Sequence, residues 1–591
     1  MKKSFLPFVT AFCLGATAVH SSDDFRPALE QAVKSGAHEF TIPAGTYHLK
    51  PVGGDNNHVT VNNAKDLTIN AEGVKLICGD MTRAVTIKNS RNVTLKGLTI
   101  DYDPLPYTQG DIIATAPDDS WVDVRIHAGY PRKPYSRIDV IDPATRFRKR
   151  GMPFLWGAKG EMRGEDVVRV YVKDIGKIAK VGDMASMSGG PRPGGVAHAV
   201  AIENCAGTVF EGVSVFSAPG FGIIEQDGDG GMRYTRCKVV PGPKPEGATQ
   251  ERLLSSVWDA MQSKTMKRGP LVEQCEIRDA GDDSWSVQSS DFMVVAVDGS
   301  TATLTFRDEH CLGPQVGDSL ATSLDGKTAE IIAKEYVKLP DDLARKVTEA
   351  PQWTLWRTNT KAVKVTVKGD VPFLVGESVY CPDRQGNGFI FRNNITRSSG
   401  RILIKAGDGM IEGNQIFDGH SGVTVSPEVP GEAAAGIRNL VIRNNTFKGT
   451  GYFCPSWSTD QAGCISIAAG AKYPVFQNIR IEGNRFEDFN GPGIVLFAAK
   501  GVSIRDNLFA RVMTAPPSVT GAGKGVNGES LLWLTRSSDI TTSGNKVYEP
   551  GAYLKATVSG KDVAQDTLDK LAEGFSIETA PSPFNLTQPS H

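Results

Sequence analysis

The stretch "RDAGDDSWSVQSS" (278–290) places two adjacent carboxylates, Asp282 and Asp283, at the entrance to a predicted strand. Like charges side by side repel, and each raises the pKa of its neighbour. A third carboxylate, Asp259 in "SSVWDAMQS", precedes Asp282 by 23 residues and Asp283 by 24. Clustered acids destabilise a fold, so a chemical role or a bound cation should account for them. These three residues are the predicted catalytic group.

Glycoside hydrolysis uses such a group. One carboxylic acid protonates the leaving oxygen, and a carboxylate activates water, the two standing roughly 6.5–9.5 Å apart in an inverting enzyme. A third nearby charge keeps the pKa of the acid raised. A calcium site competes with this chemistry, because calcium takes carboxylate oxygens. A solvated turn competes as well, because Gly and Asp are common turn residues.

A repeat along the chain predicts where these acids lie. Segments such as "FEGVSV", "YTRCKV", "IEGNQI" and "IEGNRF" share one pattern. Its fourth position recurs without interruption after 24 residues (213 to 237), 20 residues (394 to 414) and 23 residues (484 to 507). This period, with short strands, is typical of the coils of a parallel β-helix, which stack about 4.8 Å apart. One coil separates Asp259 from the Asp282–Asp283 pair, so all three are predicted to share one wall.

One position of the repeat, here called the slot, is filled by a residue of a type that is usually buried, or by Asn. A buried Asn in the slot can satisfy neighbouring backbone groups through its amide, and Cys fills it as a small hydrophobic residue. Cys454 and Cys464 are spaced to bridge a loop. The slot residues are Leu98, Val213, Cys237, Cys275, Asn394, Asn414, Asn445, Asn484, Asn507 and Asn545.

The predicted fold is all-β, a right-handed parallel β-helix of the pectate-lyase-like solenoid type. "DDFRPALEQAVKSG" has the apolar spacing of a helix that Asp24 begins and Gly36 ends, and a solenoid needs such a cap. Two stretches of alternating strands interrupt the coils as inserted antiparallel β modules. The predicted divisions are 1–18 (signal peptide), 19–104 (cap and first coils), 105–195 (module), 196–291 (coils with the acids), 292–382 (module), 383–560 (coils) and 561–591 (tail).

The bulk properties restrict location and partners. Residues 1–18 read as a signal peptide, which predicts a periplasmic or secreted protein without another membrane span. The net charge is −1 and no basic stripe appears, which argues against nucleic acid. No paired C-x-x-C and no His cluster occurs, so we expect neither a metal nor another cofactor. A carbohydrate is the expected partner, and the subunit number is left open, a dimer included.

A β-helix with Asp on one coil and an Asp-Asp pair on the next resembles the polygalacturonase-type glycoside hydrolases of family 28. The resemblance to family 110, the exo-acting α-1,3-galactosidases, is closer. That family also carries β-barrel insertions, as after residue 291 here, and then resumes with a coil like "FIFRNNITRSSGRILIKAGDGMIEGNQI". The resemblance implies Asp282 as general acid, with Asp259 and Asp283 holding the water. The motif match is confined to about 255–290 and 388–430.

The chain departs from the family pattern directly after the acid pair. Asn and His are usual there, whereas this chain has "SWSVQSS". Trp285 and Gln288 are therefore predicted to contact substrate in place of the usual residues. Trp258 also flanks the acids, and stacking on a sugar competes with core packing as the role of either tryptophan.

Four further residues are predicted to bind substrate. Arg401 and Lys405, in "GRILIKAG", follow on the next coil and can contact a sugar or an anionic substituent, with simple solvation as the alternative. Glu225 and Asp227, in "GIIEQDGDG", lie on the preceding coil and can bind hydroxyls, with a Gly/Asp turn as the alternative.

Together these features predict a secreted glycoside hydrolase that removes a terminal, α-linked galactose with inversion and without a metal. Three alternatives stay open. One is a polygalacturonase-like endo-hydrolase with an open groove. Another is a polysaccharide lyase, which Arg401 and Lys405 permit. The last is a non-catalytic glycan-binding β-helix, which does not explain why three carboxylates are spaced one coil apart.

Overall fold

In the computed structural model, the described residues run from 24 to 583. They exclude 53–56, 151, 153–154, 190–196, 307–310, 323–325, 350–360, 399, 428–435, 452–461, 470–473 and 518–525. The predicted signal peptide and Cys454 therefore lie outside the described residues. Within the described part of the chain, no helix is long and apolar enough to cross a bilayer.

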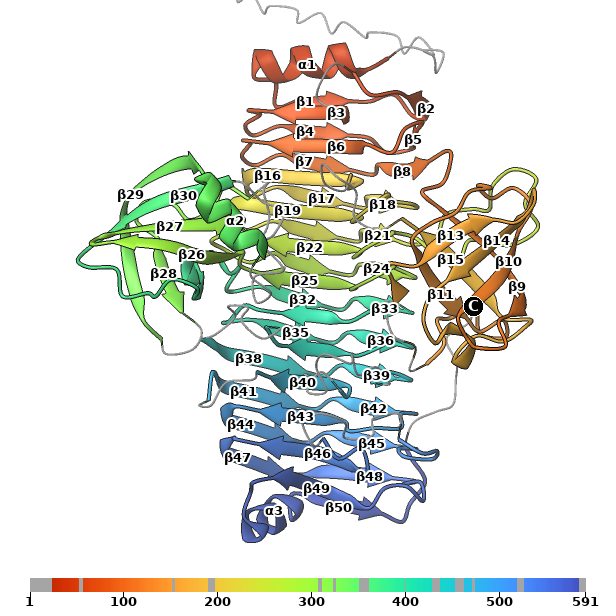
Figure 1. Ribbon diagram of the computed structural model, residues 1–591, viewed down its shortest axis with the longest axis vertical. Coiled ribbons are helices and arrows are strands. Elements are labelled where there is room, and N and C mark those ends of the chain that lie inside the picture. Colours follow the sequence, from red (N-terminus) through yellow and green to blue (C-terminus); the bar gives the residue numbers. More distant parts are fainter. Residues whose placement is uncertain are drawn as a thin grey trace, which may run out of the picture.

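Three long parallel sheets run the length of the molecule and confirm the predicted parallel β-helix (Figure 1). Sheet 1 has twelve described strands, from β1 (Glu39–Thr41) to β47 (Ser538–Ser543). Sheet 2 has thirteen, from β2 (Gly45–Leu49) to β50 (Phe575–Glu578), and sheet 3 has twelve, from β3 (Asn57–Asn62) to β49 (Ala556–Lys561). Each coil adds a strand to each sheet, so residues one coil apart lie side by side.

The slot of the repeat forms a continuous buried ladder of hydrogen bonds. Asn414, for example, donates its backbone N–H and its amide to Oδ1 of Asn445, at 3.0 and 2.8 Å. The amide of Asn414 also donates to the carbonyl of Phe391 at 2.9 Å. The ladder begins where the N–H of Cys275 donates to Asn394 Oδ1 at 2.8 Å. Because these polar groups are buried, each bond removes a donor that would otherwise be unsatisfied.

The cysteines of the described chain are free thiols in the interior. Cys237 and Cys275 lie in the main core, as predicted for small hydrophobic residues. Cys464 is also buried and free. Its predicted partner lies outside the described residues.

Both ends of the solenoid are covered. Helix α1 (Arg26–Ser35) closes the first coil as predicted and ends at Gly36, whose φ of 70° is left-handed. Asp24 accepts the N–H of Arg26 at 3.0 Å. At the other end, α3 (Gln565–Ala572) and β50 continue the fold beyond residue 560. The predicted tail therefore contains a helix and a paired strand, since β50 pairs with β48 (Asn545–Tyr548).

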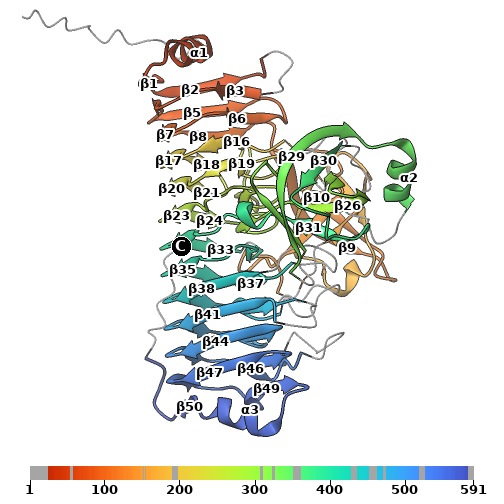
Figure 2. The same ribbon diagram turned by 90° about the vertical axis from the view of Figure 1, so that its left-hand side faces the viewer.

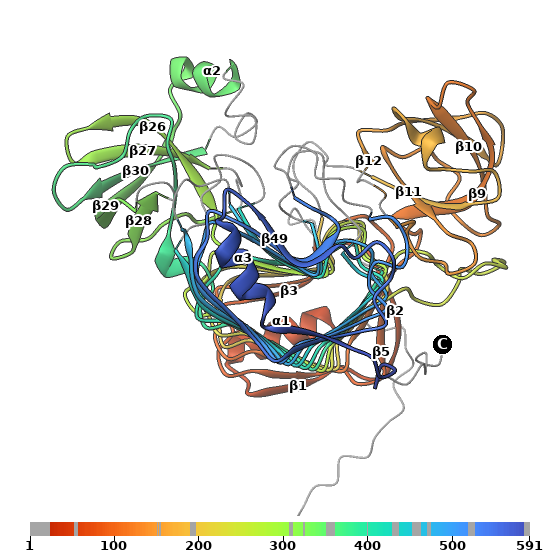
Figure 3. The same cartoon turned by 90° about the horizontal axis from the view of Figure 1, so that it is seen from below.

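Two antiparallel modules interrupt the coils, as predicted. The first module is a seven-stranded sheet from β9 (Tyr107–Thr115) to β15 (Met184–Ser188), inserted between β8 (Thr99–Tyr102) and β16 (Val200–Ala206). The second is a closed barrel from β26 (Asp291–Asp298) to β31 (Ser378–Tyr380), with α2 (Asp341–Glu349) beside it. Both modules project to the same side of the β-helix (Figure 2) and stand on either side of sheet 3 (Figure 3).

Candidate active site

The register of sheet 3 brings the three predicted acids together. Strands β22 (Met261–Lys264) and β25 (Trp285–Gln288) pair with Met261 opposite Trp285, which places Asp259 opposite Asp283 just before the strands. The N–H of Ala260 donates to the carbonyl of Asp283 at 2.9 Å. One carboxylate oxygen from each of Asp259, Asp282 and Asp283 lies within 4.8 Å of the other two. We call these three residues the acid cluster.

Asp283 is held by an arginine from the next coil. Arg401, directly before β34 (Ile402–Ile404), donates from Nε to Oδ1 at 3.0 Å and from NH2 to Oδ2 at 3.3 Å. Its backbone N–H also donates to Oδ1 at 3.3 Å. Both side chains are buried, and the two-pronged guanidinium partner fixes the orientation of the carboxylate. Arg401, predicted to bind substrate, is thus a direct partner of an acid.

The other two acids have different surroundings. Asp259 is buried, and its Oδ2 accepts hydrogen bonds from Gln262 Nε2 and Ser286 Oγ, both at 3.3 Å. Asp282 is the most exposed of the three. Neighbouring carboxylates in unlike environments are suited to unlike acid and base roles. One oxygen of each acid lies within 4.8 Å of the others, which is shorter than the separation of roughly 6.5–9.5 Å between the carboxyl groups of most inverting enzymes.

The first module sends two buried arginines behind the acid cluster. Arg137, on β11 (Arg137–Ile141), donates from NH1 to the carbonyl of Val257 at 3.2 Å and from NH2 to that of Gly281. Arg148 donates from NH2 to the carbonyl of Gly281 at 3.0 Å. Asp139 pairs with both guanidinium groups, at 3.2 and 3.3 Å. The module therefore ties together the two loops that carry the acids.

His420 completes this buried cationic side of the site. Its Nε2 lies 3.4 Å from NH1 of Arg148. Burial, and then the charges of Arg148, Arg137 and Arg401, hold the pKa of His420 well below its usual range. A neutral imidazole there can accept a hydrogen bond from a guanidinium, which an imidazolium cannot.

Two residues predicted to bind substrate point into the interior of the β-helix. Glu225, on β19 (Ile223–Gly230), is 1% exposed and accepts a hydrogen bond from the hydroxyl of Tyr234 at 3.1 Å. Trp285 is 0% exposed and stacks on Phe391, with ring centroids 5.0 Å apart. Both predictions are wrong, because the pleat turns these side chains to the core face of sheet 3.

The remaining predicted substrate contacts divide into two groups. Asp227 accepts the N–H of Leu312 at 3.0 Å and lies 3.5 Å from the thiol of Cys311, so the structure assigns it to the junction with the barrel. Gln288 and Lys405 lie on the outer face of sheet 3, two residues beyond the strand position of Ser286. Gln288 is half-buried, whereas Lys405 is 1% exposed. Contact between either residue and substrate stays a prediction.

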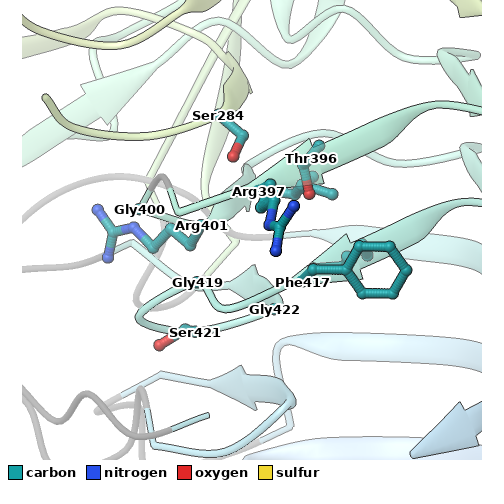
Figure 4. A pocket seen from close by; sticks show the side chains of 11 residues that line it. Ser284, Thr396, Arg397, Gly400, Arg401, Phe417, Gly419, Ser421 and Gly422 are labelled. Carbon is teal, nitrogen blue, oxygen red and sulfur yellow. The ribbon is translucent and has the colours of Figure 1, made fainter. Parts of the chain in front are cut away.

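A small pocket lies beside Ser284 and Arg401, the sequence neighbour and the ion-pair partner of Asp283 (Figure 4). Its walls include Ser284, Arg397, Arg401, Phe417 and Ser421. Arg397 and Arg401 both line this pocket, so one side of it is cationic.

Sequence reasoning missed the residues that reach the site from the first module. Arg137, Asp139 and Arg148 lie more than 100 residues before the acids, in "SRIDVIDPATRFRKRG". Alternation predicts a strand there, but no repeat relates the module to the coils. Its register against the acid loops therefore has no signal in a single sequence.

Comparisons with known proteins agree with the fold. The family described as "Right handed beta helix region" matches residues 385–560. A protein named alpha-1,3-galactosidase A from Bacteroides fragilis (strain YCH46) is 21% identical over 543 residues, covering 83% of this chain and 84% of the relative. Another of that name, from Shewanella woodyi, is 20% identical over 569 residues, covering 89% and 88%. These relatives confirm the predicted resemblance to the α-1,3-galactosidases.

Among solved structures, the catalytic unit of a thermostable GH87 alpha-1,3-glucanase from Streptomyces thermodiastaticus strain HF3-3 is similar. The TM-score is 0.43 at 10% identity. The match covers 95% of this chain and 66% of that chain, just under two thirds of its length.

Proposed function

We propose that this protein is a glycoside hydrolase that removes a terminal α-linked galactose from a glycan. The observation that carries the proposal is the acid cluster, in which Asp259, Asp282 and Asp283 offer oxygens within 4.8 Å of one another. Relatives named alpha-1,3-galactosidase, which share about a fifth of its residues over most of the chain, support α-galactoside as the substrate class.

The surroundings of the three acids favour distinct roles. Asp282, the most exposed, is proposed as the general acid that protonates the leaving oxygen. Asp283 is paired with the cationic Arg401, and Asp259 lies beside it in the same register. These two carboxylates are proposed to hold and deprotonate the attacking water. A single displacement by that water would give the inverted sugar.

The same carboxylates also have the geometry of a cation site, so a metal-independent reaction needs a physical reason. Calcium takes six to eight oxygen ligands. Here Asp283 already has a guanidinium across both of its oxygens, and Asp259 accepts hydrogen bonds from two neutral donors. These partners favour a permanent counter-charge from Arg401 over a bound cation.

The positions of the modules favour removal of a terminal sugar. The first module and the barrel stand on either side of sheet 3 (Figure 3), and the first module is bonded to the loops that carry the acids. We take this bonding of the first module to the acid loops as support for the end of a chain, because a substrate bound at its middle needs a groove that is open at both ends.

The test is product analysis on a panel of α- and β-linked galactosides and galacturonides, with and without EDTA. Free galactose from an α-linked substrate, unchanged by EDTA and released first as the β-anomer, is the expected result. Retention of the α-anomer would contradict the roles of Asp259 and Asp283. Unsaturated products that absorb in the near ultraviolet and vanish on chelation would show a lyase, and no turnover would refute the proposal.

A further inference from the structure

The first module presents an exposed aromatic ring next to the acid cluster. Trp156, on β12 (Leu155–Trp156), is 36% exposed, and it is the most exposed of the tryptophans that the structure describes. Its ring meets that of Trp258 edge to face, with centroids 6.2 Å apart. Trp258 directly precedes Asp259. Strands β11 and β12 lie on the side of the module nearest the β-helix (Figure 3).

The position of Trp156 is fixed by the same arginine that holds the acid loops. The guanidinium of Arg137 lies over one face of the Trp156 ring, 4.0 Å from its centroid. Arg137 is itself 0% exposed and donates to the carbonyls of Val257 and Gly281, just ahead of Asp259 and Asp282. A ring locked between a buried cation and a second aromatic loses little freedom when a ligand packs against it.

The aromatic wall continues onto the preceding coil. Trp258 meets Phe221 at 5.3 Å, and Phe221 stacks on His198 at 4.7 Å, with ring planes 8° apart. Phe221 lies two residues before β19, opposite Asp259 by the strand register. The N-terminal side of the acid cluster is therefore aromatic, whereas the C-terminal side is the small polar pocket beside Arg401.

We propose that Trp156 and Trp258 form a stacking subsite for a pyranose ring of the substrate, with Trp156 as the main contact. The C–H bonds of a sugar ring carry partial positive charge and pack on the negative face of an aromatic ring. Galactose suits this surface, because its axial O4 leaves C3, C4, C5 and C6 as one apolar patch. The inference rests on the proposed function and extends it, since it makes the first module part of the binding site.

The experiment measures binding apart from catalysis. An Asp282→Asn background stops turnover, and titration calorimetry with α-1,3-galactobiose gives Kd. Trp156→Ala in that background is expected to raise Kd roughly three- to tenfold, the range of one aromatic contact. Trp156→Phe keeps an aromatic face and is expected to restore most of the affinity. In the parent, sugar binding should also change the tryptophan fluorescence, and Trp156→Phe should remove most of that change.

Trp121→Ala is the matched control. Trp121 also packs under an arginine, with Arg169 3.5 Å from its ring centroid, but it lies on β10 (Trp121–Ile126), separated from β12 by three strands of the same sheet. The Kd of the Trp121→Ala variant should equal that of the Asp282→Asn parent. An unchanged Kd in a folded Trp156→Ala variant, while the otherwise wild-type enzyme releases galactose, would overturn the stacking subsite and leave the proposed function intact. Absence of galactose release by the wild type would instead refute the function.

Discussion

Replacement of Glu225 by Gln should remove a pH-dependent loss of stability from the core. Burial raises the pKa of Glu225 from its ordinary 4.5 to about 7, and hydrogen bonds from Ser263 and Tyr234 only partly oppose this rise. Between pH 4.5 and 7 the folded protein therefore holds a proton that the unfolded chain has lost. Stability falls as pH rises through this window, by 1.36 kcal/mol per pH unit, and becomes level above the folded pKa.

Over this window the free energy of unfolding falls by about 3 kcal/mol in total, since the pKa of Glu225 in the folded protein lies roughly 2.5 units above its ordinary value. For a chain of this length that unfolds as one unit, this corresponds to roughly 3 °C in Tm. Thermal unfolding of wild type and of Glu225→Gln between pH 4.5 and 8 measures this change in Tm. The variant serves as the reference, because it lacks the titrating group. The Tm of wild type should fall relative to the variant as pH rises.

Parallel curves for the two proteins, or a relative gain by wild type at high pH, would refute the reasoning. Glu246→Gln, at an exposed position, controls for the loss of one negative charge. The core position also predicts that Glu225→Gln keeps its activity, whereas a residue that bound substrate hydroxyls would lose it.

Three further substitutions test the framework of the site. Arg401→Met should destabilise the protein by about 3–5 kcal/mol in urea unfolding and abolish activity, because it leaves buried Asp283 without the charge of Arg401. Adding Asp283→Asn to this variant should restore the stability but not the activity. A double variant that stays as unstable as Arg401→Met would contradict the pairing. Asn445→Ala should lower the free energy of unfolding by about 2–4 kcal/mol in the same assay, because two donors of Asn414 lose their acceptor. A decrease below about 0.5 kcal/mol would contradict a stabilising role of the Asn ladder. Arg148→Met should lower kcat roughly 10- to 100-fold with little change in KM, since it loosens the acid loop; an unchanged kcat in a folded variant would contradict a positioning role.

The repeat made the architecture and the acid cluster predictable. Its one-coil step placed Asp259 beside Asp283 without any local motif, because stacking converts a sequence interval into contact. The slot predicted the Asn ladder for the same reason. Glu225 and Trp285 were predicted to face substrate, but the pleat turns both side chains to the core. Glu225 lies on the same face of its strand as buried Ile223, and Trp285 pairs with buried Met261. Period-two alternation, applied to these strands, would have turned both side chains inward.

The inserted modules set the limit of sequence reasoning. Their existence followed from the break in the repeat, but their contacts depend on how two independent sheets dock. Nothing near Arg137 or Arg148 in the sequence indicates that their guanidinium groups reach the carbonyls of the acid loops. Strand β50 was missed for another reason: it follows α3 and lacks the slot pattern of earlier coils.

Galactose release from an α-1,3-linked galactoside by single Asn variants of the acid cluster tests the central claim most directly. Asp259→Asn, Asp282→Asn and Asp283→Asn should each lose at least about a hundredfold in kcat/KM while remaining folded by circular dichroism. Asp279→Asn is the matched control, because Asp279 is a carboxylate of the same loop that lies outside the cluster; it should keep its activity. Full activity in any one of the three cluster variants would contradict the account, as would an equal loss in Asp279→Asn.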